Sequence, residues 1–425
     1  MVRPAGSPRL LRELNESAAL GHLLERGQLT RGELRELTGL SKPTASEMLR
    51  RLEQAGLAMV AGVASGGPGP NATVYAANPR AGYAAAVSVR EVPEVRGRRR
   101  PALEAVLLDL AGEPRARVTD SGTRPETADP EESVVTAVLS LCRKARVARS
   151  RLLHVRLGVP GSYDEAADRV HHIDVPAWSR PGLLGAIRRR LDTEVVADND
   201  ANLAAIAERG AGSAPAETGF ALLWLGVEGL GLAVDLGDRL LRGARGGAGE
   251  IGYAPVAISG RRQREDFQDL VGGPAVLALA HELGIAADSP DQAVGSAVAT
   301  ATGDATVATT AGVATNAGVA TAVAPDGPGA AARRFLNLLG ERIALGLAAV
   351  VAVLDPPLIV LSGEVGQAGG AWLADTVSTG LRSVLASDTV VVPTGVTDPD
   401  PVLLGARHAA LTASRERLLA TLATR

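Results

Sequence analysis

The sequence is poor in cysteine and lysine and has little net charge, and each shortage removes a class of protein. Cys142 is the only cysteine, so a disulfide framework and a zinc site built from several cysteines are both excluded. Lysine occurs only at Lys42 and Lys144, and the net charge of -3 excludes a uniformly basic nucleic-acid coat. Any contact with nucleic acid must therefore be local.

Long apolar runs and a secretory signal are also missing. No run approaches the roughly 18 apolar residues that a membrane helix needs. The N-terminus lacks the charged start and apolar core of a signal peptide. We therefore expect a cytoplasmic protein without a membrane segment. The 425 residues, of which 46% are hydrophobic, suffice for a large core and for more than one domain.

The stretch from Thr30 to Ala55 predicts two short helices joined by a tight turn. Thr30 and Glu33 have the spacing of a capping box, which starts the first helix. Gly39 ends that helix, and Ser41 is positioned to cap the second one. Gly56 follows as the C-terminal signal of the second helix.

The second of these helices has one apolar face and one polar face. Ala45, Met48, Leu49 and Leu52 recur at helical spacing and can face inward. The other face carries short hydroxyls near its start and cations further along, which suits contact with base edges and phosphates in a major groove. The residues expected to contact DNA are Ser41, Lys42, Thr44, Ser46, Arg50 and Arg51. The alternative is an ordinary helical hairpin with a solvated charged face.

The flanking segments complete a compact module. Leucines between Leu10 and Leu24 predict a first helix, and residues 1–9 are expected to be a disordered lead. After the hairpin, Leu57–Val63 and Thr73–Ala77 are β-prone and flank a turn-rich loop. Three helices followed by two strands predict a winged helix-turn-helix at residues 10–77. This agreement among local signals favours DNA binding.

Beyond Pro79 the predicted strands alternate with helices, which indicates an α/β fold in two successive sets. Two such sets predict two lobes with a ligand cleft between them. The expected strands are Ala84–Val89, Leu103–Leu110, Val155–Val159, Val195–Ala197, Phe220–Gly226, Leu230–Asp235, Leu358–Ser362 and Val390–Pro393. The expected helices are Pro130–Arg149, Pro181–Leu191, Ala330–Leu354 and Trp372–Ala386. Residues 287–329 are rich in Ala, Thr, Val and Gly, and we expect them to form a flexible insertion.

Three motifs carry a resemblance to a known family. They are T-G-L-S-K-P-T-A-S (38–46), A-D-N-D-A-N-L-A-A-I-A-E (197–208) and R-G-A-R-G-G-A-G-E-I-G-Y (242–253). With them the sequence resembles the ROK family, which contains sugar-responsive repressors and free-standing sugar kinases. The resemblance implies a winged helix-turn-helix followed by a two-lobed, actin-like (ribonuclease H-like) sugar-kinase domain at 80–425. Lobe one would span 80–198 plus the C-terminal helix, and lobe two 199–403.

The resemblance also implies a set of ligand-binding residues. Asn199 and Asp200 follow a predicted strand at the mouth of the cleft, where an amide and a carboxylate can bind adjacent sugar hydroxyls. The residue matching Asp200 is the general base of the family's kinases, and Glu250 matches a sugar-contacting glutamate. Tyr253 and Gln268 complete the residues expected to line the effector cleft. The alternative is that the D-N-D sequence merely caps the next helix.

The chain departs from the family's kinases at both phosphate loops. Ser88 stands where the aspartate of D-x-G-x-T is expected, and no glycine loop follows it. The second loop reads Gly226-Val227-Glu228-Gly229, so Glu228 would place a negative charge against the phosphates. Since phosphoryl transfer depends on neutralising those phosphates, we expect no kinase activity and no cofactor.

The sugar and metal positions differ as well. Tyr253 replaces the family's zinc-binding histidine and the usual cysteine cluster is missing after it, so no metal is expected. Gln268 replaces a sugar-binding glutamate, which disfavours glucose or an N-acetylhexosamine in the usual pose. The cations of Arg96–Arg100 are interpreted as a solvated turn, with a phosphate contact as the minority alternative. The linker Gly67–Pro70 lacks the family's arginine, so DNA specificity is expected to rest on the recognition helix and wing.

These observations predict a transcriptional regulator that represses carbohydrate-related genes. One recognition helix covers half a site, so we expect a homodimer on a palindromic operator in double-stranded DNA. A sugar bound in the cleft would shift the orientation of the two DNA-binding domains. Two alternatives stay open: a sugar kinase with an appended DNA-binding domain, and a DNA-binding regulator that no longer senses sugar.

Overall fold

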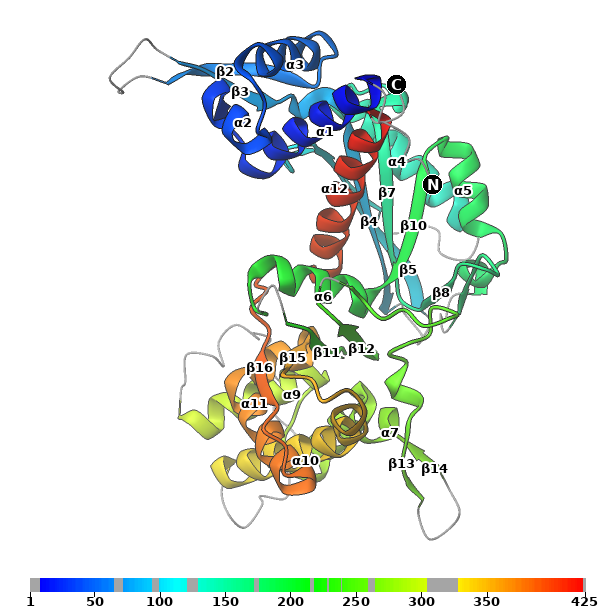
Figure 1. Ribbon diagram of the computed structural model, residues 1–425. Coiled ribbons are helices and arrows are strands. Elements are labelled where there is room, and N and C mark those ends of the chain that lie inside the picture. Colours follow the sequence, from blue (N-terminus) through cyan, green and yellow to red (C-terminus); the bar gives the residue numbers. More distant parts are fainter. Residues whose placement is uncertain are drawn as a thin grey trace, which may run out of the picture. The chain divides into compact units, whose positions relative to one another are not determined.

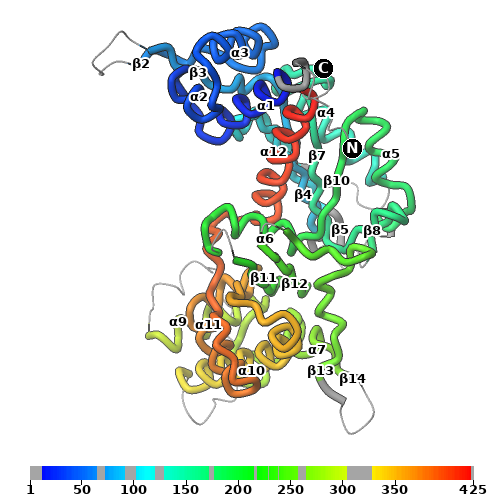
Figure 2. Tube along the Cα trace, viewed as in Figure 1, coloured from blue at the N-terminus to red at the C-terminus, as the bar shows by residue number. Residues whose placement is uncertain are grey.

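The chain forms two compact units (Figures 1 and 2). The computed structural model describes residues 8–64, 72–93, 99–120, 129–171, 176–214, 218–227, 229–237, 239–258, 264–303 and 328–422. Unit one is built from Met1–Gly161, Ala167–Asp198 and Ala406–Arg425. Unit two is built from Ser162–Ala166 and Asn199–Gly405.

Unit one begins with the predicted winged helix-turn-helix. Its elements are α1 (Pro8–Arg26), β1 (Leu29–Thr30), α2 (Arg31–Thr38), α3 (Lys42–Gln54), β2 (Ala58–Ala64) and β3 (Ala72–Ala77). The strands form a sheet in the order β1-β3-β2, in which all pairs are antiparallel. Strand β1 was not predicted because two residues are too few to show an alternating pattern. Helix α1 starts at Pro8, inside the predicted disordered lead.

The local signals that defined the hairpin act as predicted. The Thr30 backbone amide donates to Glu33 Oε2 at 2.7 Å, and the Glu33 amide donates to Thr30 Oγ1 at 3.2 Å. These hydrogen bonds hold the pKa of Glu33 below its usual value. Gly39 adopts a left-handed φ of 68° at the end of α2, and Gly56 a φ of 69° after α3.

The apolar core of the winged helix is continuous with the rest of unit one. It contains Leu20 and Leu23 of α1 and Leu49 of α3, packed with Leu418 and Leu422 of α12 (Pro401–Leu422). Figure 2 shows the red C-terminal helix ending beside the blue N-terminal helices. Arg415 of α12 donates from Nε and Nη2 to the Leu110 carbonyl at 3.1 and 2.8 Å. The winged helix is therefore docked on α12 rather than tethered by a linker alone.

The rest of unit one is a five-stranded sheet in the order β10-β7-β4-β5-β6. The strands are β4 (Tyr83–Pro93), β5 (Arg99–Asp109), β6 (Pro114–Asp120), β7 (Leu152–Val159) and β10 (Glu194–Asn199). Strands β4, β5 and β6 form an antiparallel meander, and β7 runs parallel to β4. The helices are α4 (Pro130–Ala145) and α5 (Leu183–Leu191), with 3-10 turns η1 (Pro79–Ala81), η2 (Arg149–Arg151) and η3 (Pro176–Ser179). Short strands β8 (Ser162–Asp164) and β9 (Arg169–His171) pair with each other.

Unit two has a four-stranded sheet in the order β12-β11-β15-β16. Its strands are β11 (Phe220–Leu225), β12 (Leu230–Asp235), β15 (Leu358–Ser362) and β16 (Val390–Pro393). The helices are α6 (Asp200–Ala211), α7 (Phe267–Val271), α8 (Gly273–Glu282), α9 (Pro290–Thr302), α10 (Pro328–Leu354) and α11 (Gly363–Leu385). A 3-10 turn η4 (Ile251–Tyr253) and a hairpin of β13 (Pro255–Ile258) and β14 (Arg264–Asp266) complete it. Helix α12 begins in unit two and continues into unit one.

The predicted flexible insertion was wrong over its first part. Residues 290–302 form α9, in which Ala293, Val294 and Ala297 are buried against α10 and α11. Small side chains leave little hydrophobic contrast between faces, so the composition concealed a helix that packs closely on its neighbours. Residues 304–327 of the predicted insertion lie outside the described residues. Helix α11 also begins earlier than predicted, at Gly363, and bends at Gly370.

The sequence led us to expect no apolar segment as long as a membrane helix, and helix α10 corrects that expectation. It has 27 residues and a mean hydropathy of 1.7 over its most apolar window, enough to cross a membrane by length and composition alone. Half of that window is buried inside the protein, where Phe335, Leu339 and Ile343 are fully covered. Because the core helix of a globular lobe has the same composition, we interpret α10 as the central helix of unit two.

Truncation of a side chain on α12 should loosen the winged helix selectively. Replacing Leu418 by Ala removes a buried side chain from the shared core, with an expected cost of about 2–4 kcal/mol. Amide hydrogen exchange should then accelerate in α1 and α3 while α10 stays protected. The matched control is Leu345→Ala, since Leu345 is 43% exposed. Equal protection of α1 and α3 in the parent and in the Leu418 variant would show that the winged helix folds independently of α12.

Candidate functional sites

The first candidate site is the N-terminal end of α3. Ser41, Lys42 and Thr44 are all exposed there. The Ser41 hydroxyl lies 2.8 Å from the Thr44 hydroxyl and accepts from the Thr44 amide at 3.5 Å. Ser46 is half-buried, and its hydroxyl donates to the Lys42 carbonyl at 3.0 Å. This end of α3 therefore presents one cation and two hydroxyls that a ligand can reach.

The two arginines further along α3 are already paired with an acid. Arg50 donates to Glu47 from Nε at 2.8 Å and from Nη2 at 2.6 Å, and Arg51 Nε donates to Glu47 at 2.9 Å. Hydrogen bonds from both guanidinium groups lower the pKa of Glu47 to about 2, so the carboxylate stays charged. Arg51 also lies 3.5 Å from Glu16 of α1. A DNA phosphate must compete with these carboxylates for either arginine.

The second candidate site is assembled on β12 in unit two. Helix α6 starts directly over this strand, because a Cβ at Gly231 would lie 3.2 Å from Ala201 Cβ. The glycine-rich loop that contains Gly249 contacts the next residue of β12, because the Leu232 amide donates to the Gly249 carbonyl at 3.0 Å. Gly249 has a φ of +94°, and a Cβ there would lie 1.9 Å from the Leu232 carbonyl oxygen, so only glycine fits. These contacts fix the residues that flank Ala201 and Gly249, namely Asp200 and Glu250.

The carboxyl group of Asp200 is electrostatically perturbed. Burial raises its pKa to about 6, a hydrogen bond from the Ala201 amide opposes this, and the charges of Glu250 and Glu364 raise it further. Asp200, Glu250 and Glu364 therefore lie near enough to interact. A carboxyl group whose pKa is raised by burial and by neighbouring acids is typical of a functional site.

Asn199 takes the capping role that the sequence left open. Its side-chain oxygen accepts from the Ala201 amide at 2.8 Å, and Asp200 Oδ1 accepts from the same amide at 2.8 Å. Capping fixes the orientation of both side chains at the start of α6. It leaves Asp200 with a second carboxylate oxygen for a ligand.

Tyr253 and Gln268 occupy the packed turn beside this acidic group. The side chain of Tyr253 is 56% exposed. Gln268 is half-buried and lies between Gly252 and Gly272. A Cβ placed on Gly252 would lie 3.2 Å from Gln268 Oε1, and a Cβ placed on Gly272 would lie 2.5 Å from Gln268 Nε2. Gln268 is thus held against backbone, whereas Tyr253 faces solvent.

Glu364, which the sequence did not single out, occupies the second phosphate loop. Its Oε2 accepts from the Val227 amide at 3.3 Å, in the turn between β11 and β12. Gly363 has a φ of +79°, which brings the start of α11 against the end of β11. The signal available in the sequence was an acid two residues after a predicted strand. Glu228, on which the predicted repulsion rested, lies outside the described residues.

The other departures from the kinase pattern fall in different places. Ser88 is fully buried in β4 and pairs with Glu104 of β5. Residues 96–98 and the linker Gly67–Pro70 lie outside the described residues. Within the described ranges, no group of three or more His, Cys, Asp or Glu side chains is arranged to hold a metal ion.

The raised pKa of Asp200 predicts a pH-dependent stability. Its folded pKa of about 6 exceeds the usual value of 3.8, so its contribution to stability is full below 3.8 and is lost as the pH rises through 6. Asp200→Asn should therefore match the parent in acid and exceed its free energy of unfolding by on the order of 2 kcal/mol near about pH 8. Denaturation at several pH values measures this difference. Asp192→Asn is the control, because Asp192 is 86% exposed; a difference that did not vary with pH would refute the assignment.

Comparison with known proteins identifies two family models in the chain. A model described as "ROK family" matches residues 100–275, and one described as "MarR family" matches residues 13–62. The xylose repressor of Bacillus subtilis is 23% identical over 253 residues, 59% of this chain and 62% of the repressor. The chain thus matches less than two thirds of that relative's length. A glucokinase of Streptomyces coelicolor is 30% identical over 30% of this chain and 40% of its own.

Solved structures share the fold. A ROK family transcriptional regulator, described as a homologue of the E. coli MLC protein, matches with a TM-score of 0.66 and 15% identity over 97% of this chain and 99% of that one. A ROK hexokinase from Thermus thermophilus matches with a TM-score of 0.55 and 20% identity over 77% of this chain and 97% of its own. Both lobes of the predicted α/β architecture and its N-terminal winged helix are therefore confirmed as the fold class. The chain therefore contains a ROK family domain, matched over residues 100–275, preceded by an N-terminal winged helix of the MarR type at residues 13–62.

Proposed function

We propose that the protein is a DNA-binding transcriptional regulator that represses carbohydrate-related genes and senses a sugar without phosphorylating it. The observation that carries this proposal is a MarR-type winged helix joined, in one chain, to a sugar-kinase-like domain. The xylose repressors among its relatives support the repressor role, over three fifths of their length. The expected setting is the cytoplasm, where such a regulator meets its operator.

DNA recognition is assigned to the exposed start of α3. Lys42 supplies the cation, and Ser41 and Thr44 supply hydroxyls of the length that reaches base edges in a major groove. Arg50 and Arg51 contribute where a phosphate displaces Glu47 from them, and Ser46 supports the helix from its half-buried position. A homodimer on a palindromic operator follows, since one short helix reads only half a site.

The effector site is assigned to the acidic group on β12. Asp200 and Glu250 can accept hydrogen bonds from adjacent sugar hydroxyls, and Asn199 caps the start of the helix that carries Asp200. Tyr253 offers an aromatic face at the rim, and Gln268 a neutral amide beside it. A ligand that satisfies Asp200 offsets the cost of burying its charge.

A route from this site to DNA runs through α12. A Cβ at Gly405 would lie 1.8 Å from the Leu203 carbonyl oxygen, so α12 is packed directly on α6, whose first residue is Asp200. The same helix ends at Leu418 and Leu422 in the core of the winged helix. A ligand that shifts α6 would therefore act on a helix that also belongs to the core of the winged helix, provided that the two states differ in affinity for both ligands.

A sugar kinase is the second candidate. The relatedness to glucokinases and the acidic residue Asp200 favour it. Two residues stand against it. Ser88 is buried at the position of the aspartate in the family's D-x-G-x-T phosphate loop, and the Glu364 carboxylate accepts from a backbone amide of the second phosphate loop. A carboxylate in that place repels a phosphate. It also occupies a backbone amide that would otherwise donate a hydrogen bond to the phosphate.

Removal of the exposed cation and hydroxyl of α3 should abolish sequence preference. Duplexes are first selected from fragments of the host genome that the parent chain retains. Lys42→Ala with Thr44→Ala should then lower affinity for a selected duplex at least about tenfold, relative to a scrambled one, by fluorescence anisotropy. Arg334→Ala, which removes an exposed charge from α10, should have no effect. Unchanged discrimination by the double variant would contradict the assignment of α3.

Phosphoryl transfer should be undetectable. The parent chain, incubated with ATP and a panel of hexoses, should release no more ADP than the Asp200→Asn variant does in a coupled assay. Because Glu364 blocks the Val227 amide, added nucleotide should also leave the thermal unfolding temperature unchanged. Turnover that depends on Asp200 would establish the kinase alternative instead.

A further inference from the structure

We propose that a cluster of cations between α4 and β7 is a second surface for DNA phosphates, which adds sequence-independent contacts to those of α3. The cluster, here called the basic turn, consists of Arg143, Lys144, Arg146, Arg149 and Arg151. This inference rests on the proposed DNA-binding function. It concerns a surface of unit one outside the winged helix.

The basic turn is a dense run of positive charge. Five of the nine residues from 143 to 151 are Lys or Arg, and no Asp or Glu occurs between Glu132 and Asp164. In a chain whose net charge is -3, such a run creates a local positive field. Cys142 beneath it adds no negative charge, because burial raises the pKa of its thiol.

The hydrogen bonds that hold the side chains of the basic turn in place go to neutral acceptors. Lys144 donates to the Arg117 carbonyl, Arg149 to the Arg190 carbonyl and Arg151 to the Arg80 carbonyl, each at 3.1 Å. Arg143 donates to the Ser140 hydroxyl at 2.8 Å. All four acceptors are neutral.

One exposed carboxylate approaches the basic turn, and another nearby is already paired. The nearest ion-pair distance is 4.0 Å, between Arg149 and Asp192, and the Asp192 side chain is 86% exposed. Glu132, which accepts from Thr136 of α4, is paired with Arg190 at 2.7 Å. By contrast Arg50 and Arg51 of α3 share Glu47. The basic turn therefore has more uncompensated charge than the recognition helix itself.

The basic turn lies at the end of the sheet where the chain arrives from the winged helix. Turn η1 leads from β3 into β4, and turn η2 leads into β7. Strands β4 and β7 are parallel and start together, with Tyr83 opposite Leu152. The hydrogen bond from Arg151 to the Arg80 carbonyl joins the two turns. A winged helix bound to DNA is thus connected to the same end of the sheet as the cations of the basic turn.

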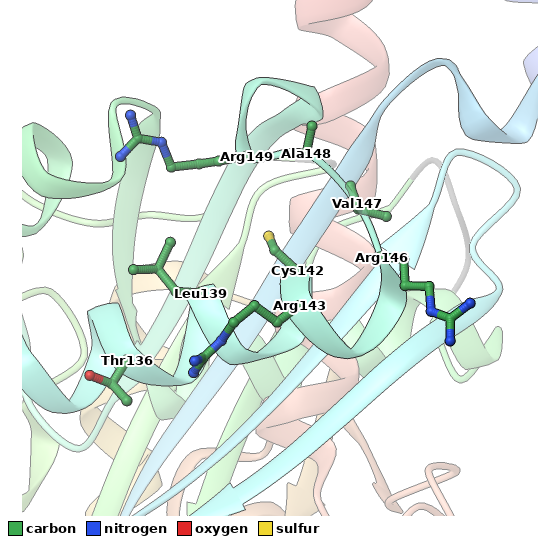
Figure 3. A pocket seen from close by; sticks show the side chains of 8 residues that line it. All are labelled: Thr136, Leu139, Cys142, Arg143, Arg146, Val147, Ala148 and Arg149. Carbon is green, nitrogen blue, oxygen red and sulfur yellow. The ribbon is translucent and has the colours of Figure 1, made fainter.

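The surface is hollowed where the arginines gather. A cavity of about 580 Å³ is bordered by Arg143, Arg146 and Arg149, and Leu139, Cys142 and Val147 contribute its apolar wall. Figure 3 shows Arg143 and Arg149 extending in the same direction, with Leu139 and Cys142 between them. Arg146 extends in the opposite direction. Guanidinium groups bind phosphate oxygens through two parallel hydrogen bonds. The pair is thus placed to receive a phosphate of the DNA backbone.

Salt dependence tests this surface. The variant Arg143→Gln/Arg146→Gln/Arg149→Gln should weaken binding to selected and scrambled duplexes by the same factor. The slope of log K against log salt should fall by about 0.9 for each phosphate that the variant no longer neutralises. The control Arg333→Gln/Arg334→Gln/Arg382→Gln makes the same charge change in unit two and should keep the parent slope. Arg146→Gln alone repeats the test with a side chain that makes no hydrogen bond to a described residue.

The outcomes separate this surface from the proposed function. A parent chain that binds no duplex at low salt refutes DNA binding itself. A parent that binds, with the same slope in the triple and single variants, refutes only the basic turn. A selective loss of discrimination also refutes it, because phosphate contacts carry no sequence information. A last outcome would assign the arginines to a small anion instead. In that case inorganic phosphate stabilises the parent but not the triple variant, and the DNA slopes are unchanged.

Discussion

The packing of α12 against the N-terminal helices is the interaction on which the rest of the structure depends. Leu418 and Leu422 complete the core of the winged helix, and Gly405 of the same helix packs on Leu203 of α6. A three-helix module of this size buries little apolar surface by itself, so the contact raises its stability and fixes its place in unit one. Helix α12 thus contributes residues to both units, and we propose that it links the DNA-binding and effector sites.

The distribution of acids and cations gives each part of the chain its chemistry. In unit two, the charges of Glu250 and Glu364 raise the pKa of Asp200, and we propose that this acidic group favours hydroxyl ligands over phosphates. In unit one, the start of α3 and the basic turn are cationic, although the chain as a whole is slightly acidic. Under the proposed function, the local sign of the charge decides which ligand each unit binds.

Much of this was predictable from the sequence where local signals were strong. Thr30, Glu33 and Gly39 placed the helix-turn-helix within one residue of its position, and the strands Leu358–Ser362 and Val390–Pro393 match as predicted. The helix α9 was missed because alanine and valine conceal its buried face, and α10 was not recognised as an unusually apolar helix. Glu364 and the basic turn were missed because their roles depend on neighbours distant in sequence, Val227 and Arg80. The roles of Asn199, Asp200, Glu250, Tyr253 and Gln268 stay predictions.

The central claim is that this chain reads DNA and no longer handles a nucleotide. Mapping the protein's binding sites on its own genome tests it most directly. The account predicts a small number of discrete sites with two-fold symmetry, next to genes of carbohydrate uptake or metabolism, and their occupancy should fall when the matching sugar is supplied. A map without enrichment at any site would contradict it.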